Sequence, residues 1–442
     1  MIEILLLAVF LVGYLAIVFE HQLKIDKLIP ALTMMAISWV IIALNLDQAI
    51  TWFDVHHGKI IDISSFTLES KKSLLDSTLL HHFGKTTEIL VFLMGAMAIV
   101  EMIDHFNGFG SIQQLIKTRK KKSLLWIIAI LSFVLSAIID NLTATIVLIT
   151  ILRKLIQEKE LRLWYAGIII IAANAGGAWT PIGDVTTTML WMAGKVTTQK
   201  LVLLLGIPSL ICMIIPVFIA SYFTVFQGKF QLEIEKSKSQ EGLGMLLIGL
   251  GLIISVPIFK TITHLPPYFG MMLALGIYAV ISEVKSNRKF SMSDAHNHSK
   301  GPTLKALGKI EMPSILFFLG ILMTIASMES LGMIFQFGEK VSATIPLEIF
   351  AGILGVASSI IDNVPLVAAS IGMFSNYLPD HSIWHLIAYA AGTGGSLLII
   401  GSAAGVVAMG MENISFVWYL KRISFLAALG YFAGLLILIL LI

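Results

Sequence analysis

The sequence contains a single cysteine and few charged side chains. Asp, Glu, Lys and Arg make up 13% of its 442 residues, about half of the ~25% that is typical of soluble domains. The lone Cys212 excludes both a disulfide framework and a thiolate metal site, and we expect it to be a small core residue. The net charge is only +3, without a basic domain, which argues against nucleic-acid binding.

Two kinds of catalytic motif are also missing. The chain has no Gly-x-x-x-x-Gly-Lys-Ser/Thr phosphate loop, so nothing supports an ATP-driven pump. Pro181-Ile-Gly-Asp184 matches only part of the Gly-x-Gly-Asp motif of intramembrane aspartyl proteases, and the chain holds no Tyr-Asp partner for it. That protease class is therefore a remote alternative, and we expect neither an enzyme nor a cofactor.

Apolar side chains are abundant. They make up 57% of the chain, and the mean hydropathy is +0.90. The apolar runs extend for about 16 to 25 residues without period-2 alternation, which predicts an all-α polytopic membrane protein and excludes a β-barrel. We interpret Met1–Phe19 as a first span rather than a cleaved signal, because it lacks a basic start and a cleavage site. The predicted spans are about 1–19, 28–52, 88–103, 164–191, 201–225, 241–259, 268–283, 311–336, 382–410 and 423–442. The long loop 53–87 between them could hold a short surface helix.

Two further apolar segments, 123–152 and 350–379, are too long for simple spans. Each has about 30 residues, whereas a bilayer core needs ~20 in a helix, and each carries an Asp-Asn pair near its middle. Basic clusters lie on both sides of 123–152, which predicts a re-entrant hairpin with both ends in the cytoplasm. With both segments as hairpins and the N-terminus outside, the cytoplasmic loops hold 22 of the 30 Lys and Arg.

The two halves of the chain repeat each other. Ser136-Ala-Ile-Ile-Asp-Asn141 matches Ser358-Ser-Ile-Ile-Asp-Asn363, and the glycines of the 164–191 and 382–410 spans recur at nearly the same offset. Each half, 1–225 and 226–442, contains five spans and one hairpin. Five crossings are an odd number, so the second repeat has inverted topology. Inverted repeats with helices broken at the midplane are an architecture of secondary transporters.

The broken helices supply candidate ion ligands. Adjacent glycines and Pro181 should unwind the helix around Asn174-Ala-Gly-Gly-Ala-Trp-Thr-Pro-Ile-Gly-Asp184. The second copy, Gly392-Thr-Gly-Gly-Ser-Leu-Leu-Ile-Ile-Gly-Ser402, keeps the glycines without the proline. Free carbonyls, hydroxyls and a carboxylate are hard oxygen ligands that suit Na⁺ or Li⁺. The alternative role of the glycines is close packing between helices.

The hairpin tips supply further candidates. Ionisable residues at membrane depth, here Asp140 and Asp362, are functional by default, although each aspartate could instead cap the helix that follows it. A carboxylate can hold either a proton or a metal cation, so both can compete for one group. We list as ion- or proton-binding candidates Asp140, Asn141, Thr143, Asn174, Gly176, Gly177, Thr180, Asp184, Asp362, Asn363, Thr393, Ser396 and Ser402. Glu101, Asp104 and Glu329, near the ends of spans, are either solvated or part of a proton path.

Three motifs carry a family resemblance. Ile139-Asp-Asn-Leu-Thr-Ala-Thr145, Asn174 to Thr188 and Ile361-Asp-Asn-Val-Pro-Leu-Val367 resemble the NhaD-type bacterial Na⁺/H⁺ antiporters of the ion transporter superfamily. The resemblance implies sodium sites at Asp140, Asn141, Asp362 and Asn363. It also implies export of cytoplasmic Na⁺, and of Li⁺, against external H⁺ across the bacterial inner membrane by a homodimer.

The same superfamily contains the sodium-coupled dicarboxylate symporters and the arsenite permeases. The symporters carry Ser-Asn-Thr at each tip, where this chain has aspartate before asparagine. Aspartates at both tips would repel a dianion and would supply titratable groups for antiport. We therefore favour antiport over two alternatives, dicarboxylate or sulfate symport and oxyanion efflux.

Overall fold

Helices form almost all of the structure. The computed structural model describes residues 2–54, 59–116, 118–229, 240–287 and 301–442. Within these ranges the only sheet is an antiparallel pair, β1 (Thr51–Asp54) and β2 (Lys59–Asp62). The polar stretch 288–300 and the acidic and basic residues of 230–239 lie outside the described residues.

The first half of the chain forms ten α-helices before residue 226. They are α1 (Ile2–Val18), α2 (Glu20–Leu23), α3 (Leu28–Leu44), α4 (Leu68–His105), α5 (Gly110–Leu115), α6 (Lys121–Ser136), α7 (Asn141–Leu155), α8 (Lys159–Gly177), α9 (Val185–Met192) and α10 (Thr198–Ala220). Short 3-10 turns, η1 (Leu46–Gln48) and η2 (Thr224–Phe226), follow α3 and α10.

The second half continues with a similar order of long helices, short helix pairs and a final long helix. It contains α11 (Gln240–Thr263), α12 (Pro267–Asn287), α13 (Pro302–Leu307), α14 (Met312–Ser330), α15 (Met333–Thr344), α16 (Leu347–Ser358), α17 (Asn363–Met373), α18 (Ser382–Gly394), α19 (Ala403–Glu412), α20 (Phe416–Arg422) and α21 (Ser424–Leu441).

Several of these helices are suited to cross a bilayer. By length and composition six described helices qualify, namely α4, α10, α11, α12, α14 and α21, and a seventh span is possible if the bent pair α19–α20 counts as one. The predicted spans 1–19 and 28–52 appear as α1 and α3, which are apolar but only 17 residues long. Seventeen residues rise about 25 Å in a helix, slightly less than a ~30 Å hydrocarbon core. The protein is a multi-pass membrane protein.

Three sequence-based boundaries were wrong. The loop 53–87 does not hold a short surface helix, because α4 runs without interruption for 38 residues from Leu68 to His105. The span predicted over 28–52 stops at Leu44, since the chain then turns into β1. The span predicted over 311–336 ends at Ser330, because Gly332 adopts a left-handed conformation (φ 76°) and starts α15 in a new direction.

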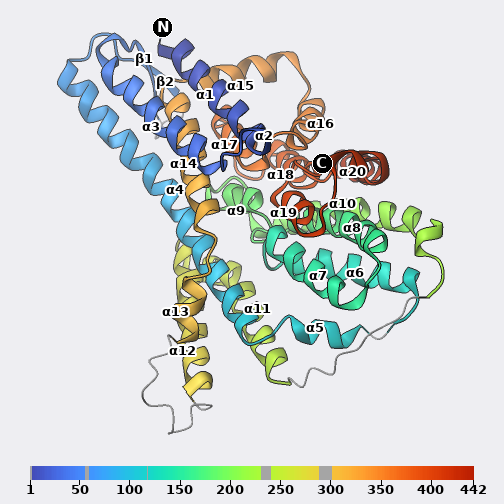
Figure 1. The fold of residues 1–442 in the computed structure, drawn as a ribbon. Helices are drawn as coiled ribbons and strands as arrows, with labels where there is room; N and C mark the ends of the chain where they lie inside the picture. Colours follow the sequence, from blue (N-terminus) through green and yellow to red (C-terminus); the bar gives the residue numbers. More distant parts are fainter. Residues whose placement is uncertain (1, 55–58, 117, 230–239, 288–300) are drawn as a thin grey trace.

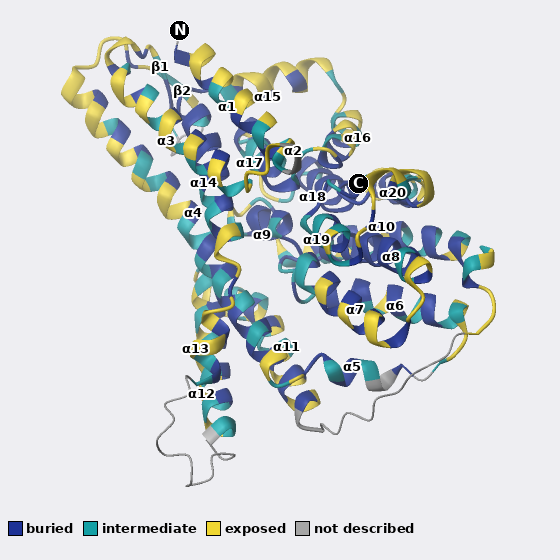
Figure 2. Ribbon diagram, in the orientation of Figure 1, coloured by how far each residue is buried: buried dark blue, intermediate teal, exposed yellow. Residues whose placement is uncertain are grey.

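The helices form two groups (Figure 1). In one group α14 packs against α3 and α4, α1 covers α3, and α11 and α12 extend along the far part of α4. In the other, α6 packs against α8, α16 against α18, and α10 against α21. Figure 2 shows that α8 and α18 are buried through most of their length, whereas α1 and α3 expose one face. The two broken helices therefore occupy the interior of the second group.

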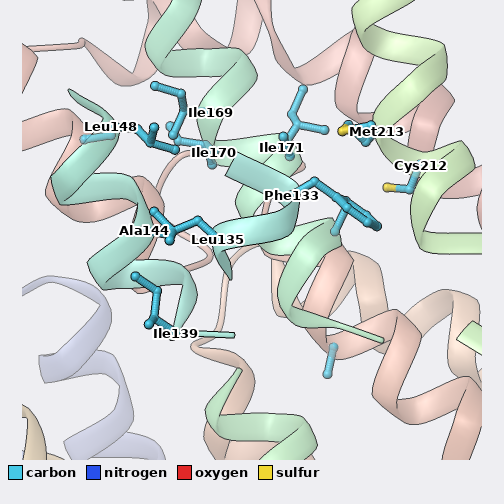
Figure 3. Close-up of a cluster of buried hydrophobic side chains, with 14 of the residues drawn as sticks. Phe133, Leu135, Ile139, Ala144, Leu148, Ile169, Ile170, Ile171, Cys212 and Met213 are labelled. Atoms are coloured by element: carbon cyan, nitrogen blue, oxygen red, sulfur yellow. The ribbon is translucent and has the colours of Figure 1, made fainter. Parts of the chain in front are cut away.

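Apolar packing fixes the first hairpin segment against its neighbours. Leu135, Ile139 and Leu148 from α6, α7 and the turn between them belong to one buried cluster with Ile169–Ile171 of α8 (Figure 3). Cys212 of α10 lies in the same cluster and is fully buried, as the sequence predicted.

An ionic contact joins the first hairpin to the last broken helix. Glu412, at the end of α19, is buried and accepts hydrogen bonds from Arg153 Nε at 2.7 Å and Arg162 Nε at 3.0 Å. Arg153 belongs to α7 and Arg162 to α8. A buried carboxylate is tolerated where basic groups pair with it and satisfy its oxygens.

Candidate functional site

The first hairpin tip is the turn between α6 and α7. Asp140 has an extended backbone, and its carboxylate accepts hydrogen bonds from the Thr143 amide at 2.8 Å and the Thr143 hydroxyl at 2.6 Å. Asp140 is therefore an N-cap of α7, the alternative role considered from the sequence. The cap positions Asn141 in the first turn of α7, where its side chain is buried.

The second tip has the same sequence and a different partner. Asp362 caps α17 by accepting the Val364 amide hydrogen at 3.3 Å. It also forms an ion pair with Lys27, with 3.5 Å between Lys27 Nζ and Asp362 Oδ2. Lys27 precedes α3 and lies over the ring of Phe317 at 4.5 Å. The sequence gave no signal for this contact, because Lys27 and Asp362 are 335 residues apart.

Each interior helix is interrupted next to a hairpin tip. Helix α8 ends at Gly177, and α9 begins after Asp184, which caps it by accepting the Thr186 amide and hydroxyl hydrogens at 2.9 Å each. Helix α18 ends at Gly394, and α19 begins after Ser402, which accepts the Gly405 amide hydrogen at 3.2 Å. The capping residue is thus an acid in one half and a hydroxyl in the other.

Matching glycines allow the hairpins to approach the broken helices closely. A Cβ placed on Gly176 would lie 2.2 Å from the Phe133 carbonyl oxygen, and one on Gly394 would lie 2.2 Å from that of Gly355. The hydroxyls of Ser136 and Ser358 donate to the carbonyls of Ala173 and Ala391 at 2.6 and 2.9 Å. The packing role considered for these glycines is therefore present in both halves.

The side chains of both halves meet at Asp184. Asn141 Nδ2 donates to Asp184 Oδ2 at 2.7 Å and to Asn174 Oδ1 at 2.9 Å. Asn363 Nδ2 approaches the two Asp184 oxygens at 3.4 and 3.5 Å. Asn174 Nδ2 in turn donates to the Ser402 hydroxyl at 3.0 Å, which links the two broken helices. All five side chains are buried.

Asp184 is the electrostatic centre of this network. It is 2% exposed and has no ion-pair partner among the residues that the structure describes. A buried carboxylate that has hydrogen-bond donors but no basic partner is costly, and a proton or a cation at Asp184 would offset that cost. Its oxygens and the side-chain oxygens of the two hairpin asparagines are hard donors, which suit Na⁺ and Li⁺.

A cavity opens beside this network. The binding pocket, as we call it, is a narrow cavity of about 50 Å³, and its wall contains both hairpin tips and Asp184. Its ionisable lining residues are Lys27, Asp140, Asp184 and Asp362. Three carboxyl groups against one ammonium group make it a pocket for cations rather than for anions.

The other predicted residues lie outside the pocket wall. Thr180 donates to the Ala137 carbonyl at 2.6 Å and so holds the first hairpin tip. Thr393 and Ser396 donate to carbonyls of their own helix segment, those of Tyr389 and Thr393. Gly177 packs on the Gly183 carbonyl oxygen, and a Cβ there would lie 2.5 Å from it.

The three span-end acids occupy different surroundings. Glu101 lies 4.0 Å from Lys309 Nζ and is about one-third exposed. Asp104 is exposed, as a solvated span end would be. Glu329 lines a second cavity, whose wall does not include Asp184. Sequence reasoning missed Lys27 and Thr186; the run Thr186-Thr187-Thr188 after Asp184 was a usable signal for the latter.

Comparison with known proteins identifies the family of this chain. The family model CitMHS, described as "Citrate transporter", matches residues 14–386. Sodium/proton antiporter 1 of Arabidopsis thaliana is 39% identical over 434 residues, which are 96% of this chain and 70% of that protein. The Na⁺/H⁺ antiporter NhaD of Vibrio parahaemolyticus is 30% identical over 426 residues, 91% of this chain and 97% of that protein.

A solved structure is similar in fold. The YdaH transporter of Alcanivorax borkumensis aligns with a TM-score of 0.59 at 12% identity, over 93% of this chain and 97% of that one. The family model matches most of the chain, and the antiporter alignments cover 96% and 91% of it. The chain belongs to the CitMHS family of transporters and is a relative of the NhaD-type antiporters, as its motifs predicted.

Proposed function

We propose that this protein is a secondary transporter that exchanges cytoplasmic Na⁺, and also Li⁺, for external H⁺. The observation that carries the proposal is the buried Asp184 carboxylate between Asn141 and Asn363, without a basic partner among the described residues. The proposal agrees with the names of two relatives, which are both called Na⁺/H⁺ antiporters.

One carboxylate can serve both ions in turn. With a proton on Asp184, the charge is removed and the two asparagine amides can remain as hydrogen-bond partners. With Na⁺ at Asp184, a half turn of either amide directs its oxygen toward the cation and replaces part of the hydration shell. Because a proton and Na⁺ cannot occupy the same oxygens together, release of one permits binding of the other.

In this scheme the aspartates at the hairpin tips act on the cation from a greater distance than Asp184 does. Asp140 is held by Thr143, and Asp362 is held by Lys27. Both line the binding pocket, so their charge attracts cations toward Asp184. We propose Asn174 and Ser402 as supports that fix the orientation of Asn141, through the hydrogen bonds among them.

We propose inverted repeats over 1–225 and 226–442 as the underlying architecture, with re-entrant hairpins at 123–152 and 350–379. Equivalent residues make equivalent contacts in the two halves, which supports this interpretation. Gly176 and Gly394 each pack against a hairpin carbonyl, and Ser136 and Ser358 each donate to a carbonyl of the neighbouring broken helix. The basic loops favour an N-terminus outside, in a bacterial inner membrane. The homodimer remains an expectation from the family resemblance.

A single assay separates the candidate functions. Everted membrane vesicles with an imposed pH gradient receive Na⁺, Li⁺, K⁺, succinate or citrate, and a fluorescent probe reports dissipation of the gradient. Antiport predicts a response to Na⁺ and Li⁺ and none to succinate or citrate. Absence of a response to both Na⁺ and Li⁺ would contradict the proposal, and a sodium-dependent response to the dianion would favour symport.

A further inference from the structure

A second cavity lies toward the β-hairpin end of the molecule. This vestibule is an open cavity of about 600 Å³, and Phe53 of β1 contributes to its wall. Its lining carries ionisable side chains from three segments, which are His81, His82, Lys85 and Glu88 of α4, Lys195 after α9, and Glu329 of α14. Apolar side chains of α9, α14 and α17 form much of the remaining wall.

The vestibule and the binding pocket are lined by successive turns of the same four helices. On α14 Phe318 lines the binding pocket and Leu322 the vestibule, and on α17 Val364 and Ala368 do the same. A separation of four residues corresponds to about 6 Å along a helix. Helices α4 and α9 repeat this relation through the pairs Leu93 and Ile89, and Val185 and Met189.

Buried apolar side chains line both cavities where they come nearest along these helices. Phe92 in the wall of the binding pocket is 1% exposed, and Met189 and Leu322 in the wall of the vestibule are 2% and 8% exposed. A hydrated cation does not pass a closed apolar layer of this kind, because it would have to leave its water without replacement ligands. Joining the vestibule to Asp184 would require these side chains to move.

Glu329 is placed to receive an ion from the vestibule. Its carboxyl group packs beside Gly372 of α17, where an added Cβ would lie 3.2 Å from Glu329 Cδ. Opposite it, Lys195 Nζ donates to the Ser375 carbonyl at 3.2 Å and lies 4.8 Å from the Trp384 ring centre. Burial lowers the pKa of Lys195, and the negative charge of Glu329 opposes that shift. Helix α17 presents no charged side chain to this wall.

A buried imidazole also lines the vestibule. His82 is 8% exposed, and its Nε2 has no hydrogen-bond partner among the described residues. Buried polar atoms in folded proteins normally have a partner. This nitrogen can form a hydrogen bond with water in the vestibule.

We propose that the vestibule is the route by which external protons reach Asp184, with Glu329 as the group that receives them. This inference rests on the proposed antiport. The proton enters through the polar mouth, is held by Glu329, and passes to Asp184 when the layer of Phe92, Met189 and Leu322 opens. The binding pocket then serves the Na⁺ side.

Cysteine labelling tests the two routes without any transport measurement. In a Cys212→Ser background, Ala368→Cys places a thiol in the vestibule and Ala96→Cys places one in the binding pocket. A membrane-impermeant methanethiosulfonate is added to one side of the membrane at a time. We expect the two cysteines to react from opposite sides, and reaction of both from the same side would overturn the proposal.

A transport measurement tests Glu329 itself. Purified protein in liposomes is assayed with the pH set separately on each side, for Glu329→Gln and for the control Glu339→Gln, an exposed acid on α15. We expect Glu329→Gln to lower exchange by about tenfold, the size of a typical coupling between sites, and to remove its dependence on vestibule-side pH. The apparent KM for Na⁺ should not change.

The two proposals fail in different ways. If Glu329→Gln keeps the wild-type response to pH on both sides, Glu329 is not the proton-receiving group, whether or not antiport occurs. If the wild-type protein shows no Na⁺-dependent proton movement, antiport is wrong, and the labelling result alone then decides whether the vestibule and the binding pocket open to opposite sides.

Discussion

The two hairpin tips have the same Asp-Asn sequence and different electrostatic partners. In the first tip the Asp140 carboxylate accepts hydrogen bonds from the amide and hydroxyl of Thr143, and Asn141 Nδ2 lies 2.7 Å from Asp184 Oδ2. In the second tip Asp362 is paired with Lys27, and Asn363 lies no closer than 3.4 Å to Asp184. The backbone scaffold is repeated, but the charges on it are not.

The difference in charge between the two tips indicates where a single cation site can form. The position equivalent to Asp184 in the second half is Ser402, which is neutral and already receives a hydrogen bond from Asn174. Lys27, which belongs to the first half, adds a positive charge next to the second tip. A symmetric site would hold two cations near each other, whereas this arrangement favours one site at Asp184, closer to the first tip.

Replacing Asp184 should have the largest effect. Asp184→Asn keeps the shape and an oxygen but cannot titrate or carry charge, so we expect exchange to fall to about 1% of wild type or less. Asn can still cap α9, so the protein should fold normally. Sodium-dependent proton flux in vesicles, together with size-exclusion elution of the purified variant, checks both points. Exchange near the wild-type rate would move the ion site away from Asp184.

A matched pair of tip variants probes the comparison directly. Asp140→Asn and Asp362→Asn both preserve a capping residue, and each removes one negative charge from the binding pocket. We expect Asp140→Asn to raise the apparent KM for Na⁺ by about tenfold, or ~1.4 kcal/mol. Asp362→Asn should have a smaller effect on KM, because Lys27 already neutralises that carboxylate. Equal effects would show that the tips are equivalent.

The residues that meet at this site could be named from the sequence because they lie in short or repeated motifs. The Asp-Asn tips, the double glycines and Asp184 can be recognised within a few residues of chain. Asp184 was considered an ion ligand and not the cap of α9, and ion binding at these residues stays a prediction. The Lys27–Asp362 pair could not be, because only the folded chain brings them together. Thr393 and Ser396 looked like ligands by composition, but both lie where a helix carbonyl is the nearest acceptor.

The fold, like the site, was predicted only in part from the sequence. Long apolar runs located most of the helices, but the first part of α4 was missed because Glu69, Lys71 and Lys72 interrupt its hydropathy. Tertiary contacts stabilise that part: Lys71 is buried and donates to the carbonyls of Asp47 and Ala49 at 2.9 and 2.7 Å.

Removing Lys27 should make the two halves more alike. Lys27→Met deletes a positive charge 3.5 Å from Asp362, so a second cation or proton can take its place. We expect the apparent KM for Na⁺ to fall by about fivefold, or ~1 kcal/mol, and the pH profile to broaden. Lys24→Met, in the same loop and exposed, is the control. An unchanged KM in Lys27→Met would mean that the pair does not influence the ion site.

The smallest effect is expected at Ser402. Ser402→Ala removes the acceptor for Asn174 and the cap of α19, which should lower thermal stability by about 1 to 2 kcal/mol. Exchange should change less than about twofold, because Asp184 and both hairpin asparagines remain. Ser415→Ala, which removes the exposed cap of α20, is the matched control for the unfolding midpoint. A large loss of exchange would make Ser402 a ligand rather than a support.

The buried ion pairs of Glu412 connect helices that should move together during transport. Arg153 extends from the first hairpin and Arg162 from α8, and both hold the end of α19. Separating them would leave a carboxylate stranded in the interior, at a free-energy cost of about 3 to 5 kcal/mol. The first hairpin and the two broken helices should therefore shift as one rigid body. The contacts of α9 with α4 and of α17 with α14 would then form the surface along which it moves.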